Sequence, residues 1–306
     1  MKPTALVTGA SGFLGRRLVA ILRRADHPVV AWYRGPSPPS IDPGLRWEPW
    51  PAIDALTAGI ERLESPIIYH LAAAANRNAH DPAVQFESNI RLTAALVAAG
   101  ADARARGFVY AGSCTEYGPT PAGVPIPETA PLASVNLYDA SKAAAGLWAQ
   151  AVARNCGLGF AWARLFSLYG PGLRPPRLLP LVHAALREKR ALTIVSQVRD
   201  WLYVDDAAEG MLRLGDHAAA GGHGIFNLCT GRGLSNQDIV TRFAHRMGAD
   251  VGLLDFRALS GREGEAPWLV GDPTAAGKLG WSARTELDAG LDETIAALDR
   301  ERANGS

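Results

Sequence analysis

The sequence is poor in cysteine and carries no excess charge of either sign. Its 306 residues include three cysteines, Cys114, Cys156 and Cys229, which cannot all pair with one another and lack the spacing of metal ligands. These features exclude a disulfide-stabilised scaffold and are typical of a reducing compartment. The formal net charge is +1 and no basic stripe stands out, so nucleic acid is not an expected partner.

Long apolar runs are also absent. No run approaches the ~20 residues that a helix needs to cross a bilayer, so no membrane partner is expected. The first apolar run begins at Ala5, which leaves no room for a signal sequence, and we therefore expect a cytoplasmic protein. With 48% apolar and 20% charged residues, the chain can bury a large core in one domain or in two closely joined domains.

A glycine-rich turn follows the first apolar run, in the segment Ala5-Leu6-Val7-Thr8-Gly9-Ala10-Ser11-Gly12-Phe13-Leu14-Gly15. Gly9 can adopt a backbone conformation closed to other residues, Gly12 lets the main chain approach a pyrophosphate, and Gly15 lets helix and strand pack closely. The N–H groups at the start of the following helix can then bind the phosphates. We expect a dinucleotide cofactor at Gly9, Ser11, Gly12, Phe13, Leu14 and Gly15.

Short apolar runs alternate with helical stretches along most of the chain. Helices are expected over 12–24 and 84–99, and the strand-like runs are 5–8, 29–32, 67–71, 107–111, 159–165 and 225–228. This alternation predicts an α/β fold with a doubly wound parallel sheet, the Rossmann fold. From Ser167 onward the pattern loosens, which indicates a smaller C-terminal substrate-binding domain interleaved with the first. We assign 1–166 and 201–229 to the dinucleotide-binding domain, and 167–200 and 230–306 to the smaller one.

Tyr138 and Lys142 are spaced to share one face of a helix. An ammonium beside a phenol favours the phenolate, which lowers a pKa that is otherwise near ~10. The tyrosine can then exchange a proton with a substrate hydroxyl near neutral pH. A Tyr-x-x-x-Lys spacing is common by chance, and its combination with the glycine-rich turn is what points to redox catalysis.

Together the two motifs resemble the extended branch of the short-chain dehydrogenase/reductase family, which acts on nucleotide sugars. Further segments match that family in the expected order along nearly the whole chain: Tyr69-His70-Leu71-Ala72-Ala73, Asn89 with Thr93, Gly112-Ser113-Cys114-Thr115-Glu116-Tyr117-Gly118, Arg164 to Gly172, Arg199 to Asp206, Arg262-Glu263-Gly264-Glu265 and Leu279-Gly280-Trp281. One segment alone is weak evidence, whereas the ordered set is strong.

The resemblance implies roles for particular residues. Tyr138 would be the general acid or base, Ser113 would hydrogen-bond the same substrate oxygen, and Lys142 would also contact the nicotinamide ribose. Leu71, Ala72 and Ala73 would line the cofactor. The substrate would contact Thr115, Glu116, Ser167, Arg199 and Arg262; the two arginines suit a diphosphate, and the family more often has asparagine at position 167. Similar enzymes form homodimers through the helix bearing the tyrosine and the helix containing Asn89, so a homodimer is expected.

Three residues have a second interpretation. Glu116 is either a second acid/base facing the sugar or a loop carboxylate. His70 closes an apolar strand, which favours a structural role, and Cys114 is interpreted as a small filler side chain. The remaining histidines form no ligand set, so no metal site is expected.

The end of the second strand bears on the cofactor. It reads Val30-Ala31-Trp32-Tyr33-Arg34, without the carboxylate that would hold the free 2′-OH of NAD. Arg34 suits the extra phosphate of NADP instead, with Ser37 as a possible helper. The sequence therefore favours NADP(H) over NAD(H).

The reaction is less constrained than the fold. A similar 4,6-dehydratase would have an Asp-Glu pair after the catalytic serine, where this chain has Cys114-Thr115. Because Arg34 favours NADPH, we predict reduction of a 4-keto nucleotide sugar. The alternatives are an NAD-dependent nucleotide-sugar 4-epimerase and, more distantly, an NADPH-dependent reductase of a non-nucleotide ketone. A non-catalytic dinucleotide sensor is disfavoured, because such proteins typically lack the tyrosine and lysine.

Overall fold

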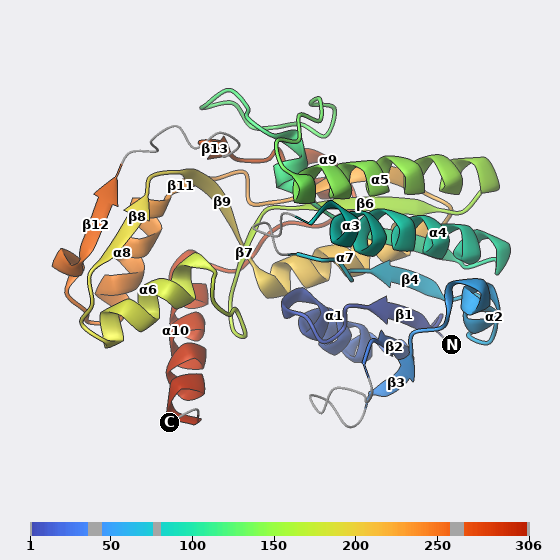
Figure 1. Cartoon of the computed structure of the whole chain (residues 1–306), viewed down its shortest axis with the longest axis horizontal. Coiled ribbons are helices and arrows are strands. Elements are labelled where there is room, and N and C mark those ends of the chain that lie inside the picture. The colour runs from blue at the N-terminus through green and yellow to red at the C-terminus, as the bar shows by residue number, and fades with distance from the viewer. Residues whose placement is uncertain (1, 36–44, 76–80, 258–265, 305–306) are drawn as a thin grey trace.

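A seven-stranded parallel sheet forms the centre of the computed structural model, which describes residues 2–35, 45–75, 81–257 and 266–304. The strand order is β10-β6-β5-β4-β1-β2-β3, so the order of the strands along the chain reverses between β1 and β4 (Figure 1). The strands are β1 (Ala5–Thr8), β2 (Val29–Tyr33), β3 (Arg46–Pro49), β4 (Ile67–His70), β5 (Gly107–Ser113), β6 (Phe160–Leu165) and β10 (His223–Leu228). The predicted doubly wound α/β fold is confirmed.

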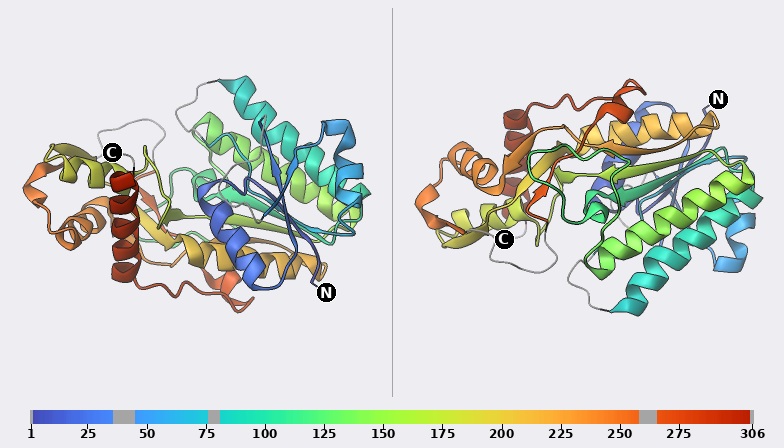
Figure 2. Two further views of the ribbon diagram at one scale, coloured as in Figure 1. Left: turned by 90° about the horizontal axis from the view of Figure 1, so that it is seen from below. Right: turned by 90° about the horizontal axis from the view of Figure 1, so that it is seen from above.

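Helices cover both faces of this sheet (Figures 1 and 2). One face packs against α1 (Phe13–Arg24) and α7 (Val204–Ala219), and the other against α2 (Leu56–Glu61), α4 (Leu92–Asp102) and α5 (Leu137–Cys156). Successive strand residues point to opposite faces, which is why Val7 packs with α1 and α7 whereas Leu6 packs with α2 and α4.

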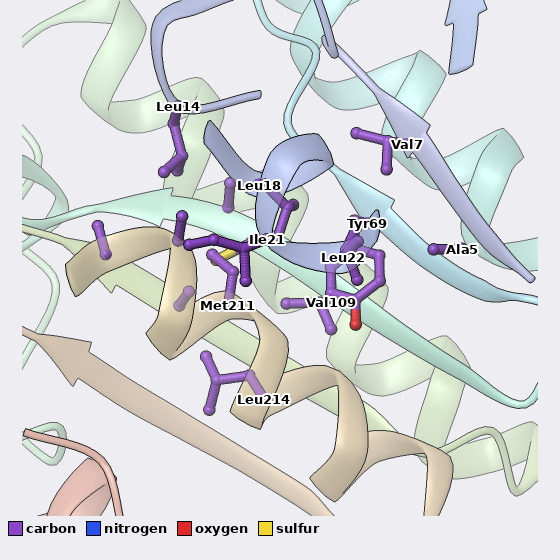
Figure 3. Packing of buried hydrophobic residues seen from close by; sticks show 14 of the residues in the cluster. Ala5, Val7, Leu14, Leu18, Ile21, Leu22, Tyr69, Val109, Met211 and Leu214 are labelled. Atoms are coloured by element: carbon purple, nitrogen blue, oxygen red, sulfur yellow. The ribbon is translucent and has the colours of Figure 1, made fainter. Parts of the chain in front are cut away.

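The core between the sheet and the pair α1 and α7 is apolar and tightly filled. Figure 3 shows Leu18 and Leu22 of α1 and Met211 and Leu214 of α7 against Val109 of β5. Each is at most 1% exposed. Burial of a side chain of this size contributes roughly 1.5–3 kcal/mol, so this packing holds α1 against the sheet.

The helix predicted over 84–99 is longer and interrupted. It consists of α3 (Pro82–Gln85), a π-helical turn (Phe86–Arg91) and α4. Asp81 begins it, accepting the Ala83 N–H at 2.9 Å, and Pro82 occupies the first turn. The π turn brings Asn89 into the interior, where only 1% of it is exposed.

A smaller region is built beside the carboxyl ends of the large sheet (Figure 1). In it, β9 (Val198–Tyr203) pairs with β7 (Ser167–Tyr169), β11 (Gly233–Ser235) and β13 (Trp268–Leu269). A second ribbon joins β8 (Leu192–Val195) to β12 (Leu254–Arg257). Helices α6 (Leu178–Arg187), α8 (Asn236–Arg246) and α10 (Leu287–Asn304) share one apolar core with these strands.

The boundary predicted at residue 201 falls inside β9, because Trp201–Tyr203 pairs with β7 in the smaller region. The short helix α9 (Thr274–Gly277), assigned from the sequence to the smaller domain, lies against β10 of the large sheet. Ala276 and Trp281 enter the core of α1 and α7, and the Trp281 indole donates to the Asp206 carbonyl at 2.9 Å. Apolar residues that join a distant core singly in this way form no periodic pattern, so the sequence gives no sign of the contact.

Two elements, one strand of the large sheet and one helix packed on it, were not expected from the sequence. The edge strand β3 reads Arg-Trp-Glu-Pro, which lacks the apolar run of a central strand. The helix α2 has six residues, too few to show a period. Across the described ranges, the helices all fall short of the length and apolarity needed to cross a membrane.

Candidate active site

A cavity at the carboxyl ends of β1, β2, β4, β5 and β6 gathers nearly all the residues predicted from the sequence. These are the cofactor set Gly9, Ser11, Gly12, Phe13, Leu14, Gly15, Arg34, Leu71, Ala72 and Ala73, the catalytic set Ser113, Tyr138 and Lys142, and the substrate set Thr115, Ser167 and Arg199. Two predicted residues are missing from this list. Glu116 does not line the cavity, and Arg262 lies outside the described residues.

The glycine-rich turn has the geometry of a phosphate cradle. Gly9 has φ of 72°, and a Cβ there would stand 2.8 Å from the Ala72 nitrogen. A Cβ on Gly15 would stand 2.1 Å from the Gly9 carbonyl oxygen, so α1 can approach β1 this closely only with glycine. Gly12 is the N-cap and has no side chain to cap the first N–H groups of α1. The turn therefore fits a dinucleotide pyrophosphate.

His70 is a structural residue that holds the strand ends together. Thr93 Oγ1 donates to the Asn89 carbonyl at 2.6 Å, so it must accept from His70 Nε2, 2.9 Å away. His70 Nδ1 then accepts from Thr8 Oγ1 at 2.8 Å. Burial lowers the pKa of His70 to about 3, which keeps the ring neutral. The structural interpretation of His70 is confirmed.

Asn89 connects the loop after β4 to α5. Its Oδ1 accepts the Ala74 N–H at 2.7 Å, and its Nδ2 donates to Gln85 Oε1 at 2.7 Å and to Ser141 Oγ at 2.9 Å. Ser141 lies on α5 between Tyr138 and Lys142. One buried amide thus links the loop after β4 to the helical turn that carries Tyr138 and Lys142.

Tyr138 and Lys142 lie in the first two turns of α5 and both line the cavity. Asn136 caps this helix by accepting the Asp139 N–H at 2.9 Å. Lys142 is only 3% exposed, and its ammonium lies 4.3 Å from the centroid of the Tyr110 ring. Burial, partly opposed by the charge of Glu116, lowers the pKa of Lys142 to about 8. A cation held this way can stabilise a phenolate on Tyr138.

Ser113, at the end of β5, faces the same cavity. Its Oγ lies 2.8 Å from Thr115 Oγ1, and Thr115 in turn donates a hydrogen bond to Asp139. The prediction that Thr115 lies on the substrate side agrees with its place in the cavity wall. Asp139 was missed from the sequence, although it directly follows Tyr138 in the first turn of α5.

Glu116 is the one predicted substrate contact that the structure contradicts. Its side chain is fully buried, where Oε1 accepts the Ser113 N–H at 2.8 Å and Oε2 pairs with Arg164 Nε at 3.2 Å. Burial, which outweighs the attraction of Arg164, raises the pKa of Glu116 to about 7. Arg164 is itself stacked against Tyr117 and Trp162. Glu116 is therefore a loop carboxylate that anchors Ser113 from behind.

Arg34 lines the end of the cavity formed by β2, as the sequence predicted. Its guanidinium lies 5.0 Å from the centroid of the Trp50 ring, and Trp32 and Tyr33 line the same end. Trp50 was not predicted, because it follows the unexpected strand β3. Ser37, the possible helper, lies outside the described residues.

The substrate side of the cavity continues toward the smaller region. A second hollow is lined by Ser167, Arg177, Gln197, Arg199 and Asn236, together with Thr115 and Asp139. The Arg199 guanidinium donates to Gln197 Oε1 at 2.6 Å, which fixes its position in this wall. Arg177 at the start of α6, and Arg174 in the main cavity, add cations that the sequence did not single out.

Comparison with known proteins agrees with this geometry. Residues 5–229 match a model of the NAD dependent epimerase/dehydratase family. The chain is 28% identical to a dTDP-glucose 4,6-dehydratase from Streptomyces griseus, over 97% of this chain and 94% of the relative. It is 29% identical to a UDP-glucose 4-epimerase from Mycolicibacterium smegmatis, over 95% of this chain and 96% of the relative.

A solved structure of MoeE5 in complex with UDP-glucose and NAD is similar over the whole fold. It superposes with a TM-score of 0.86 at 26% identity, covering 98% of this chain and 99% of MoeE5. The matched family model, the full-length relatives and the Ser113, Tyr138 and Lys142 cluster lead to one conclusion. The chain belongs to the NAD dependent epimerase/dehydratase family, the extended short-chain dehydrogenase/reductase enzymes that act on nucleotide sugars.

Proposed function

We propose that the chain is a nucleotide-sugar 4-epimerase that retains NAD and recycles it. The observation that carries this proposal is the set of groups after Ser113. Cys114 is buried and Thr115 has no charge, so the two positions where a dehydratase would have an acid and a base hold neither. Epimerisation at one carbon needs one reversible acid/base, and Tyr138 beside Lys142 is suited to that task.

Each of the side chains in this cluster has a separate role in the proposed reaction. Tyr138 takes the proton of the reacting hydroxyl as that alcohol becomes a ketone. It returns the proton after the sugar has turned the opposite face of the ketone toward the cofactor. Lys142 stabilises the phenolate, and Ser113 hydrogen-bonds the same oxygen. The glycine-rich turn and Leu71 to Ala73 would hold the nicotinamide cofactor, which supplies a reversible hydride acceptor when bound.

The similarity to a UDP-glucose 4-epimerase, and to a structure holding UDP-glucose and NAD, supports this proposal. The sequence alone favoured the reductase and left the epimerase as its alternative. Arg199 and Arg177 line the substrate hollow, and their charges suit the diphosphate of a nucleotide sugar better than an uncharged ketone.

A second candidate is an NADPH-dependent 4-ketoreductase. It is favoured by Arg34, whose guanidinium reaches the cavity where the adenosine ribose of a cofactor would lie, and by Tyr33 occupying a position where NAD would require a carboxylate. The guanidinium is stacked on Trp50, which leaves its edge available to phosphate oxygens.

One experiment separates the two. One sample of the purified protein is denatured, and the cofactor that it releases is identified by chromatography. A second, native sample is incubated with UDP-glucose and with dTDP-glucose. An epimerase converts either sugar into its 4-epimer without net consumption of added cofactor. Consumption of NADPH with a 4-keto nucleotide sugar, and no epimer from the hydroxyl sugars, would replace the proposal with the reductase.

A further inference from the structure

Ser113 belongs to a chain of three side chains that ends in a carboxylate. Ser113 Oγ lies 2.8 Å from Thr115 Oγ1, which hydrogen-bonds Asp139 Oδ1. Asp139 is only 1% exposed, and its other oxygen accepts from Asn136 Nδ2 at 2.6 Å. The carboxylate thus lies, almost fully buried, at the edge of the substrate hollow, and it is not among the residues that line the cavity with Ser113, Tyr138 and Lys142.

The acceptor at the end of this chain fixes the direction of every hydrogen bond in it. An ionised carboxylate only accepts, so the single hydroxyl proton of Thr115 must point to Asp139. Between Ser113 and Thr115, therefore, Ser113 is the donor. Ser113 Oγ also accepts the Thr115 backbone N–H at 3.3 Å, which leaves one lone pair of Ser113 for the cavity.

We propose that Asp139 is a positioning residue that, through Thr115, holds Ser113 as a hydrogen-bond acceptor, so that the site takes up its nucleotide sugar as an alcohol at the reacting carbon. A substrate hydroxyl can donate to the Ser113 oxygen. The oxygen of a ketone carries no proton, so it could not form a hydrogen bond to the remaining lone pair of the Ser113 oxygen. The inference rests on the proposed function only in taking Ser113 to face the reacting oxygen.

An asparagine at position 139 would reverse the chain. The amide oxygen of the new side chain would stay on Asn136 Nδ2, and its amide N–H would point at Thr115. Thr115 would then donate to Ser113, and the Ser113 proton would be turned toward the cavity. Asp139→Asn is therefore expected to shift the binding preference of the site from the hydroxyl sugar toward the keto sugar, while the shape of the site changes little.

The test measures binding without turnover, in a Tyr138→Phe background that lacks the proton-transferring phenol. Dissociation constants for UDP-glucose and for UDP-4-keto-6-deoxyglucose are determined by calorimetry, and the ratio of the two constants is compared between variants. The second sugar also lacks the 6-hydroxyl, but this difference affects the ratio equally in every variant. Asp139→Asn is expected to shift the ratio about five- to tenfold toward the keto sugar, the worth of one neutral hydrogen bond.

Two further variants show whether the effect passes through Thr115. Thr115→Val breaks the chain, so Asp139→Asn added to it should leave the ratio unchanged. Thr115→Ser keeps the hydroxyl and should restore the full shift. Asp238→Asn is the matched control: Asp238 also accepts from its N-cap residue, Ser235, in the first turn of a helix, but it is exposed on α8.

An unchanged ratio in Asp139→Asn, or an equal shift with valine at position 115, would overturn the inference while leaving the proposed function intact. Failure of the UDP sugars and of the corresponding dTDP sugars to bind would overturn the two together. A shift that also occurs in Asp238→Asn would mean a general electrostatic effect, and this too would contradict the role of Asp139.

Discussion

The Lys142 ammonium is held against the face of the Tyr110 ring, 4.3 Å from its centroid, and the Tyr110 hydroxyl donates to the Lys142 carbonyl at 3.0 Å. Tyr110 therefore contacts both the ammonium group of Lys142 and the helical turn that carries it. The buried site makes this charge sensitive to pH, because burial lowers the pKa of Lys142 from 10.5 to about 8.

The first prediction concerns the alkaline side of the pH profile. As pH rises through about 8, Lys142 loses its charge and no longer stabilises a phenolate on Tyr138, so kcat/KM should fall. Glu116→Gln removes a negative charge that raises the pKa of Lys142, and it should move this limb to lower pH. Steady-state rates between about pH 6 and 10 test both, and a limb that stays in place would contradict the coupling.

The second prediction concerns the tyrosine itself. Tyr138→Phe should lower kcat by roughly 100-fold or more, because proton transfer is lost while the ring still fills its place. Cofactor titration by fluorescence should give a nearly unchanged dissociation constant. Turnover close to that of the unmodified chain would refute the role of Tyr138.

The third prediction tests the buried ion pair of Glu116 and Arg164. Arg164→Met leaves a carboxylate alone in the interior, which should cost about 3–5 kcal/mol of unfolding free energy. Without Arg164 the pKa of Glu116 rises further above its unfolded value, so the folded chain binds the extra proton and stability falls as pH rises. Urea unfolding should thus show a larger loss at about pH 8 than at about pH 5.

Adding Glu116→Gln to Arg164→Met provides the control. The second change removes the isolated charge, so part of the loss should be recovered and its pH dependence should disappear. A purely additive loss at both pH values would mean that the two residues act independently.

The fourth prediction concerns the phosphate of the cofactor. If Arg34 meets a 2′-phosphate, Arg34→Ala should weaken NADPH binding by roughly 10- to 150-fold and leave NADH nearly unaffected. Arg46→Ala, on the neighbouring strand β3, is the matched control, since Arg46 is exposed and paired with Glu48. Tighter binding of NADH by the unmodified chain would exclude the 2′-phosphate role and strengthen the epimerase proposal.

The fifth prediction concerns assembly. Phe86, Leu147 and Trp148 are 52%, 53% and 57% exposed on the segment leading into α4 and on α5, where the sequence led us to expect a dimer contact. Trp148→Glu should convert a dimer to a monomer in light scattering at micromolar concentration. Leu181→Glu, an exposed leucine on α6, should not. A monomeric unmodified chain would rule the dimer out.

The sequence predicted the parallel sheet and the gathering of Ser113, Tyr138 and Lys142 at one cavity because both depend on local patterns. The glycine spacing defines the first turn, and the four-residue spacing places Tyr138 and Lys142 together. Glu116 could not be interpreted correctly, since its partner Arg164 is 48 positions away along the chain. Asp139 was overlooked for a similar reason: its role depends on a contact with Thr115, which comes from a different element.

Asn89, Gln85 and Ser141 hydrogen-bond one another between the loop after β4 and α5. A change at any one of the three removes at least two of these buried hydrogen bonds. In an alignment of relatives these positions should therefore covary: a chain that replaces Ser141 with alanine is expected to carry a compensating change at Gln85. The same constraint means that the three residues should be transferred together when α5 is grafted onto another scaffold.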